Sequence, residues 1–579
     1  MQHFLFLKHS NTYLHVYSLL QVLFCYPFYI LYPHKLFQIT LGRTRIKLPQ
    51  NRITKRTKFR NILHKGIIGA SFGFLFWLPF WWFIVANVLS ALLYRILFTL
   101  FACFIIYCCI IFISIRVVKE ADNSVLCNMP IRFSKTYFNS TILPYFILFL
   151  IICIGIFSLL HDNSYVGVSL CYPLSIAIFV FVPRIYRFWF GFFVGVFGFY
   201  WIALSFRFQD LDIAIPFAIV VIGLIYGILF WFLCYFQNLV FRFVAMLLLF
   251  VIHPLDFNWL NIVYFSSYSV FEASMLSMLC VSFALYVIVA NNTLYWLAPI
   301  LLLIAFDYNM QIQKPKLHAK IIETTYSQDM RWLPNNQEYI IKNNLLEINN
   351  AIKEGYSLVI LPETAFPFAL NLETDVYNKL LELSHHITIA TGAIRIQDSN
   401  ITHPTNLKQS KKQTQTFTLD KPPNIETIQK ERYINKPNMK AGYYNTTYIF
   451  SKGFVLVADK NVLVPFGETL PFNDFLSPVF EWFFGDTFGF NSGNGLVSFI
   501  LQGFHIAIAN CYEGTMDLPY TTGAKYILML SNNAWFSPST QHFMQQMIAK
   551  YYARNYQVFI YHSTNYTPKA IITPNNGKD

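Results

Sequence analysis

Charged residues are scarce in this sequence, and acidic residues are the scarcest of them. Only 12% of the 579 residues are charged, with 29 Asp and Glu against 43 Lys and Arg, whereas 55% are hydrophobic. This is not the composition of an ordinary soluble protein. The apolar excess lies within about residues 13–307, and the remainder has the composition of a globular domain. The division predicts a polytopic membrane protein that carries one soluble domain.

Cysteine is nearly absent from the polar C-terminal half, where Cys511 stands alone. The other nine cysteines lie in the hydrophobic half, at positions 25, 103, 108, 109, 127, 153, 171, 234 and 280. Cys511 therefore has no disulfide partner in its own half, and no metal site can be built there from cysteines. It ends an apolar run, Phe504–Asn510, that is typical of a buried strand and that we expect to break at Gly514. Taken alone, Cys511 fits a small core side chain and a nucleophile about equally well.

Acidic residues are missing altogether from residues 33–66, and this segment is strongly basic. The formal net charge of +14 raises nucleic acid as a partner, but apolar segments flank this basic block. The block therefore indicates membrane orientation and anionic lipid surfaces, and no nucleic-acid partner is expected. No cleavable signal peptide is expected either. The ten basic residues of the block are Lys35, Arg43, Arg45, Lys47, Arg52, Lys55, Arg56, Lys58, Arg60 and Lys65.

Ten apolar segments are candidate membrane spans, because a spanning helix needs about 20 mostly apolar residues. We expect residues 1–141 to be an N-terminal extension with about three spans and the basic loop 33–66. Residues 142–310 are expected to be a core membrane domain with about seven spans. Placing the basic loops inside gives a consistent alternation, which puts the soluble half in the periplasm. The candidate spans are roughly 13–32, 67–87, 91–115, 142–161, 165–183, 188–206, 213–236, 239–253, 269–290 and 293–307.

The membrane half offers packing signals and no clear catalytic ones. Gly191, Gly195 and Gly198 form a small-residue face that is suited to close helix packing, and we interpret it as packing only. No ladder of intramembrane charges is evident in the sequence, so a transporter is disfavoured.

Residues 311–579 show short β-rich runs that alternate with helical stretches. We predict helices over 335–353 and 376–383 and strands over 356–361 and 388–396. This alternation is typical of a layered α/β or α+β domain. Residues 398–440 are rich in Gln, Lys, Thr, Pro and Asn, and they are expected to form a polar, mobile insertion.

Three reactive side chains lie at the ends of predicted strands in this half. Glu363 comes after the apolar run that ends at Leu361, with Pro362 between them, and Cys511 follows Asn510. Lys460 lies just before an apolar segment, and Glu468 lies on the turn after that segment. A carboxylate, an amine and a thiol are the groups that covalent acyl transfer requires. The carboxylate takes the thiol proton, the thiolate attacks, and the ammonium stabilises the oxyanion.

The three motifs, in this order, resemble the nitrilase or carbon–nitrogen hydrolase superfamily, whose Glu–Lys–Cys triad lies on an αββα sandwich. More narrowly, the sequence resembles the apolipoprotein N-acyltransferase family, whose nitrilase-like domain lies on the periplasmic side of a multi-span membrane domain. The resemblance covers about residues 142–579. The segments that carry it are Leu463-Val-Pro-Phe-Gly-Glu468, Tyr444-Asn-Thr446, Cys511-Tyr-Glu513 and Ser531-Asn-Asn-Ala-Trp-Phe536 followed by Gln541-His542.

The resemblance implies a two-step acyl exchange in the bacterial inner membrane. Cys511 would take a fatty acyl chain from a phospholipid as a thioester, and the N-terminal amine of a diacylglyceryl-cysteine apolipoprotein would accept it. Glu363 would act as the base and Lys460 would stabilise the oxyanion, with no metal or organic cofactor and with the protein as a monomer. The family pattern also implies that Asn445, Glu468, Tyr512 and Glu513 line or support the site. Trp332 would lie on the side where lipid enters.

Two departures from the family pattern leave alternatives open. Residues 1–141 have no counterpart in it, and the chain stops soon after Asn576-Gly577, a strong hairpin signal that no return strand follows. We therefore expect a C-terminus that is truncated relative to the family. The alternatives are a membrane-tethered amidase or nitrilase that uses water as the acceptor, and a degenerate homologue without activity.

Overall fold

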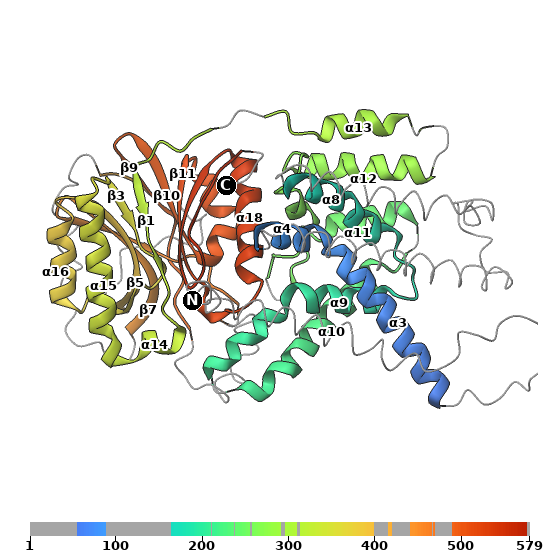
Figure 1. Cartoon of the computed structure of the whole chain (residues 1–579), viewed down its shortest axis with the longest axis horizontal. Coiled ribbons are helices and arrows are strands. Elements are labelled where there is room, and N and C mark those ends of the chain that lie inside the picture. The colour runs from blue at the N-terminus through green and yellow to red at the C-terminus, as the bar shows by residue number, and fades with distance from the viewer. Residues whose placement is uncertain are drawn as a thin grey trace, which may run out of the picture. The chain divides into compact units, whose positions relative to one another are not determined.

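The computed structural model, shown in Figure 1, describes a helical N-terminal part and a C-terminal part built on two β-sheets. The predicted spans 13–32, 91–115 and 142–161, and most of the basic loop, lie outside the described residues, as does the Asn576-Gly577 turn. The residues described are 55–88, 164–209, 211–236, 238–254, 257–290, 294, 296–309, 313–398, 415–419, 441–465, 467–468 and 489–575.

The helical part contains two stretches that are long and apolar enough to cross a membrane, as judged over the described residues. These are Arg187–Phe208 and Asp212–Leu233, and the pair Ile62–Phe76 and Leu78–Ile84, bent by 59°, adds a third if it is one span. The helices are α3 (Lys55–Phe76), α4 (Leu78–Val88), α8 (Ser164–Phe181), α9 (Arg187–Phe199), α10 (Ile215–Leu233), α11 (Leu239–Leu248), α12 (Met275–Ala290) and α13 (Leu297–Ala305). The 3-10 helix η4 (Tyr200–Gln209) continues α9.

Two of the predicted spans correspond to helices that are shorter than expected. Helices α11 and α13 have 10 and 9 residues, so neither can cross the hydrocarbon core by itself. After α11 the chain turns at Leu249–Ile252 and meets Pro254, which cannot continue a helix. The predicted total of ten spans stays a prediction.

The glycines of α9 let it pack closely against α10, as the sequence predicted. A Cβ atom on Gly191 would lie 2.4 Å from Cβ of Phe230, and one on Gly195 would lie 2.8 Å from Cβ of Tyr226. Such distances are too short for real atoms, so the backbones approach only because these positions lack side chains. This packing places η4 and α10 side by side. Together they form one wall of the candidate site described below.

The C-terminal part is a sandwich of two sheets, so the predicted nitrilase-like αββα fold is confirmed. The first sheet has the order β1-β3-β5-β7-β8, with β4 beside β5, and the second has the order β13-β12-β11-β10-β9-β6, with β2 beside β12. The strands are β1 (Ala319–Ile321), β2 (Glu323–Thr324), β3 (Leu358–Ile360), β4 (Phe366–Ala369), β5 (Thr388–Asp398), β6 (Gln415–Thr418), β7 (Ala441–Ser451), β8 (Phe454–Asp459), β9 (Val497–Leu501), β10 (Phe504–Asn510), β11 (Tyr526–Asn532), β12 (Phe559–Asn565) and β13 (Ala570–Ile572).

Successive side chains of a strand point to opposite faces of its sheet, which explains the two cores, one between the sheets and one beneath the outer helices. In β3, Leu358 and Ile360 face the second sheet, where they pack with residues such as Ile506 and Leu528. Val359 and Leu361 belong to the core on the opposite face, beneath α15 (Pro334–Lys353) and α16 (Thr374–Leu383). Both faces of β3 are therefore buried, which is why the strand is continuously apolar. Figure 1 shows α15 and α16 outside the first sheet and α18 (Gln541–Tyr556) outside the second.

Most elements predicted for this half are present, and one expectation is corrected. The helices predicted over 335–353 and 376–383 are α15 and α16, and the strands predicted over 356–361 and 388–396 are β3 and β5. The segment 398–440 was expected to be a loop throughout. Within it, however, Gln415–Thr418 forms β6, which pairs in parallel with β9 at the edge of the second sheet.

Arg554 fastens α18 to the helical part of the chain. Its Nη1 donates to the backbone oxygens of Ser266, Ser267 and Ser269 at 2.8–3.1 Å, and its Nη2 donates to the oxygen of Phe271 at 2.7 Å. Nη2 also pairs with Asp307 Oδ2 at 2.6 Å. The side chain is buried, so these contacts replace the water that the guanidinium loses.

Replacing Arg554 by Met should lower the free energy of unfolding by about 3–5 kcal/mol, because the buried backbone oxygens of the Ser266–Ser269 segment and the partly buried Asp307 would lose their partner. The midpoint of thermal unfolding in detergent measures this effect. Lys379→Met is the control, because the Lys379–Glu382 pair is exposed and should contribute at most about 1 kcal/mol. Equal midpoints for the two variants would contradict the anchoring role of Arg554.

Candidate active site

Three strand ends bring the predicted reactive side chains together. Glu363 follows β3 and Lys460 follows β8, both in the first sheet, whereas Cys511 follows β10 in the second. All three are buried, and all three line one cavity. The site therefore lies where the ends of the two sheets meet.

The Lys460 ammonium lies between two carboxylates. Its Nζ is 3.1 Å from Glu363 Oε1 and 2.8 Å from Glu468 Oε2, and the residue is 1% exposed. Burial by itself lowers the pKa of Lys460, but Glu363, Glu468 and Cys511 outweigh it and leave the pKa raised. Lys460 is therefore charged at neutral pH, and it serves as a fixed positive charge.

The Glu363 carboxylate is held at both oxygens. Oε1 accepts from Asn445 Nδ2 at 2.8 Å as well as from Lys460, and Oε2 accepts from the backbone N–H of Asn532 at 2.9 Å. Asn445 comes from β7 of the first sheet, and Asn532 ends β11 of the second. Both sheets thus fix the orientation of this carboxylate.

Cys511 has a left-handed backbone that ends the strand abruptly. Its φ is +50°, and it begins the 3-10 helix η10 (Cys511–Thr515). Such a backbone costs a residue other than glycine on the order of 1–3 kcal/mol. A reciprocal cap between Asn510 and Glu513 holds the turn, with the Asn510 N–H donating to Glu513 Oε2 at 3.0 Å. The strand therefore breaks at the sulfur itself, and not at Gly514 as the sequence suggested.

The Cys511 thiol is protonated at neutral pH. Burial raises its pKa, the nearby Glu363 and Glu468 carboxylates raise it further, and Lys460 and the Asn532 backbone N–H lower it, for a result of about 12. A thiol in this state needs a base to take its proton before it can attack. The Glu363 carboxylate, which lines the same cavity, is the candidate base.

Gly392 and Arg331 fix the turn that carries Glu363. A Cβ on Gly392 in β5 would lie 2.3 Å from the Thr364 nitrogen and 2.6 Å from Glu363 Cα, so only glycine fits there. Arg331 in α14 (Gln328–Trp332) donates to the backbone oxygens of Glu363 and Thr364 and to Thr364 Oγ1. Burial lowers the pKa of this guanidinium to about 10.

The predicted supporting residues take two kinds of position. Asn445 and Glu468 contact the charged cluster directly, since Asn445 Nδ2 also donates to Glu468 Oε1 at 2.7 Å. Glu513 lies behind it, where Oε1 accepts from the backbone N–H groups of Asn461 and Val462 at 2.5 and 3.0 Å. Glu513 thus ties the loop after Lys460 to the turn at Cys511. Burial raises the pKa of Glu513, and the backbone donors oppose that rise.

Tyr512 and Trp332 are the aromatic members of the predicted set, and both line the cavity. The Tyr512 ring stacks on Phe257 of the helical part with 5.8 Å between ring centroids and an interplanar angle of 3°. Nearby, Trp259 Nε1 donates to Thr515 Oγ1 at 2.8 Å. Trp332 is 44% exposed, which is unusual for a tryptophan and places it at the rim of the cavity.

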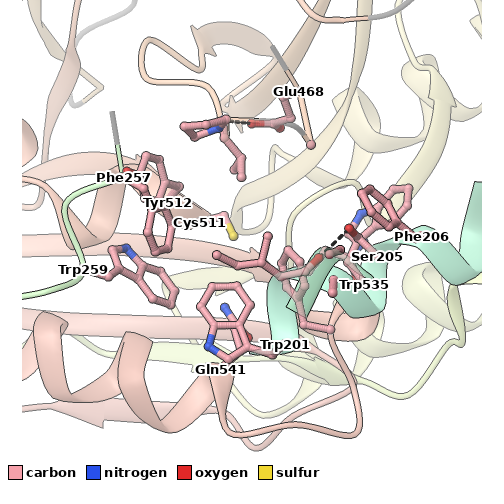
Figure 2. A pocket seen from close by; sticks show the side chains of 18 of the residues that line it. Trp201, Ser205, Phe206, Phe257, Trp259, Glu468, Cys511, Tyr512, Trp535 and Gln541 are labelled. Atoms are coloured by element: carbon pink, nitrogen blue, oxygen red, sulfur yellow. Dashed lines mark hydrogen bonds between the residues drawn. The ribbon is translucent and has the colours of Figure 1, made fainter. Parts of the chain in front are cut away.

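The cavity has a volume of about 360 Å³ and is mostly apolar away from the charged cluster. Figure 2 shows the Cys511 sulfur among Tyr512, Phe257 and Trp259 on one side and Trp201 below, with Glu468 above. Residues of η4 and α10 form a wall of their own. Those wall residues are Trp201, Ile202, Ala203, Ser205, Phe206, Ala218, Val221, Ile222, Ile225 and Tyr226. A long apolar group can therefore lie against the helical part while its polar end reaches the sulfur.

Sequence reasoning assigned no role to several of these groups. Gly392 was detectable, because an isolated glycine inside a strand pattern indicates a close backbone approach. Arg331 was not, since nothing in a linear sequence separates a buried arginine from an exposed one. The Asn532 contact comes from the backbone, which no side-chain pattern reports.

The fold and the site together define an enzyme of the carbon–nitrogen hydrolase type, with a Glu–Lys–Cys cluster, joined to a helical membrane domain. Two family profiles agree: "Apolipoprotein N-acyltransferase integral membrane domain" matches residues 138–308, and "Carbon-nitrogen hydrolase" matches residues 326–575.

Comparison with similar proteins identifies the family within the carbon–nitrogen hydrolase class to which the chain belongs. The apolipoprotein N-acyltransferases of Wolinella succinogenes and Helicobacter pylori are both 35% identical to this chain, over 414 and 428 residues respectively. These matches cover 70 and 71% of this chain and 89 and 90% of the relatives. That of Helicobacter hepaticus is 34% identical over 413 residues, which cover 70% of this chain and 94% of the relative. The chain belongs to the apolipoprotein N-acyltransferase family and is a bacterial membrane protein.

Gly392→Ala should lower the rate of lipoprotein N-acylation about hundredfold, because the added methyl group displaces the Glu363 turn by a fraction of an ångström or more. Gly66→Ala is the control, since a Cβ there lies 3.9 Å from its nearest neighbour. An unchanged rate in Gly392→Ala would show that the turn tolerates the shift.

Glu363→Gln should make the Cys511 thiol more acidic, although it removes the base. The Glu363 carboxylate raises the pKa of Cys511, so its loss lets the thiolate form at lower pH. Alkylation of the Cys511 peptide by iodoacetamide at pH 8, followed by mass spectrometry, should be about tenfold faster than in the wild type. Glu347→Gln changes an exposed carboxylate and should leave the pH profile unaltered. A slower reaction in Glu363→Gln would refute the electrostatic account.

Proposed function

We propose that this chain transfers a fatty acyl chain from a phospholipid to the N-terminal amine of diacylglyceryl-cysteine apolipoproteins, through a thioester on Cys511. The observation that carries the proposal is the placement of the sulfur. Cys511 opens, beside Glu363 and Lys460, into an apolar cavity whose wall is made by the membrane-part elements η4 and α10. A soluble amidase has no need of such a wall, whereas a lipid donor and a lipidated acceptor both do.

In the first step, Glu363 takes the Cys511 proton and the sulfur attacks the ester carbonyl carbon of the phospholipid. The carbonyl oxygen becomes an oxyanion, which the Lys460 ammonium stabilises. When the carbon–oxygen ester bond breaks, Glu363 returns the proton to the departing alkoxide. The products are a lysophospholipid and a Cys511 thioester.

In the second step, the amine of the acceptor attacks the thioester carbonyl carbon. Glu363 takes a proton from the attacking nitrogen, and Lys460 again stabilises the oxyanion. The carbon–sulfur bond breaks, an amide forms, and the thiol regains its proton from Glu363. The base is therefore ready for another cycle without a cofactor.

The remaining residues have supporting roles in this proposal. Asn445 and Glu468 keep Lys460 and Glu363 paired, Glu513 holds the Cys511 turn, and Tyr512 and Trp332 contact the acyl chains. Residues 142–310 form the core membrane domain, and residues 311–579 form the catalytic domain on the periplasmic side of the inner membrane. The basic segment 33–66, placed on the inner side, supports this orientation. In this proposal the protein acts as a monomer.

The test uses the full chain in vesicles with a phospholipid labelled in its acyl chain. Without acceptor, the wild type should hold label that neutral hydroxylamine releases, and with a model diacylated lipoprotein the mass should rise by one acyl chain. Cys511→Ala should do neither, whereas Cys280→Ala, which removes a cysteine of the membrane part, should do both. Transfer by Cys511→Ala would rule out the thioester. Release of free fatty acid in place of transfer would identify an amidase-like hydrolase, and no labelled enzyme would favour a degenerate homologue.

A further inference from the structure

A chain of three buried polar side chains lies behind Cys511, and the reaction described above makes no use of it. Gln545 of α18 places Nε2 3.6 Å from Cys511 Sγ and 3.2 Å from Ser531 Oγ. Ser531 Oγ is in turn 2.8 Å from His562 Nε2. Gln545 and Ser531 are completely buried, and His562 is 4% exposed. The three come from α18, β11 and β12, so the fold has to bring them together.

Hydrogen counting shows which end of the Gln545 amide faces the sulfur. With the Gln545 nitrogen toward Cys511 and Ser531, both N–H groups of this amide have acceptors. Of the polar atoms of this side chain, Oε1 alone then lacks a partner among the described residues. With the amide reversed, the nitrogen would take the place of Oε1. Two buried N–H groups would then lack an acceptor, where the first orientation leaves one oxygen without a donor. Unmet buried groups are costly, so the first orientation is favoured.

His562 and Ser531 maintain that orientation. Burial, with a smaller contribution from His542, lowers the pKa of His562 to about 3, so the ring is neutral at physiological pH. A neutral ring can accept at Nε2 from the single Ser531 hydroxyl hydrogen, which leaves the Ser531 oxygen to accept from Gln545. The second amide hydrogen then points to Cys511 Sγ.

From this arrangement we infer that Gln545 is a positioning residue of the nucleophile, whose oriented amide N–H stabilises the Cys511 thiolate. The inference rests on the proposed function only in that Cys511 is the nucleophile. Two carboxylates, the buried Glu363 and the partly buried Glu468, oppose thiolate formation, and Lys460 is already shared between them. A neutral donor adds stabilisation without adding a charge that would compete for Glu363.

The same helix carries Arg554, which anchors α18 to the helical part. Gln545 therefore lies on a helix that contacts the membrane part directly. A contact made from a loop would not be fixed in this way.

The experiment measures the pH dependence of Cys511 alkylation by iodoacetamide in the full chain, with the peptide quantified by mass spectrometry. Gln545→Leu keeps the size of the side chain but removes its donor, so the profile should move to higher pH and the rate at pH 8 should fall about tenfold. Gln546→Leu makes the same change at the neighbouring, partly exposed position and should leave the profile unchanged. A wild-type profile in Gln545→Leu, with only a lower unfolding midpoint, would reduce Gln545 to a packing role and overturn the inference.

A second pair of variants decides the matter if Gln545→Leu does not fold. Ser531→Ala frees the amide to rotate and should slow alkylation at pH 8, whereas Ser531→Thr keeps the hydroxyl and should restore it. Equal profiles for these two would refute the oriented amide. Alkylation also separates this inference from the proposed function. If the wild type forms no thioester, but its alkylation profile still differs from that of Gln545→Leu as expected, only the proposed function is refuted.

Discussion

A buried ammonium held between two carboxylates is the interaction on which the site depends. Isolated charges are expensive to bury, and Lys460 is tolerated in the interior because Glu363 and Glu468 both contact it. Burial raises the pKa of the neighbouring Cys511 thiol, and the two carboxylates raise it further. The same contacts fix the orientation of Glu363, the proposed base. Stability and chemistry therefore use one set of hydrogen bonds.

The helical part and the catalytic part share the task of building this site. The catalytic sandwich supplies every charged group, while η4, α10 and the Phe257–Trp259 segment supply apolar surface and the ring beneath Tyr512. Arg554 of α18 joins the two parts through hydrogen bonds to the backbone oxygens of Ser266 and Phe271. The turn at Cys511 is thus supported by the sheets on one side and by the helical part on the other.

How much the sequence could predict follows from how local each signal is. Glu363, Lys460 and Cys511 were proposed because each lies at the edge of an apolar run, and such edges are readable from hydrophobicity alone. Glu363 and Cys511 come after their runs, and Lys460 comes before its run. Strand β6 was missed because its pairing with β9 depends on residues about 80 positions away, and its own sequence is polar. Helices α11 and α13 were overestimated because hydropathy continues past the point where the backbone turns. Arg331 and Gln545 look like surface residues until the fold encloses them.

The shared cavity has a consequence for the order of events at the membrane. In the proposed reaction, one space beside Cys511 receives the donor lipid first and the lipidated acceptor second. The spent lysophospholipid must therefore diffuse away sideways before the acceptor can enter, and the two compete for the same apolar wall of η4 and α10. The rate of lipoprotein maturation would then follow the local ratio of lysophospholipid to acceptor in the bilayer. Enzymes that remove lysophospholipid would accelerate this protein without ever contacting it.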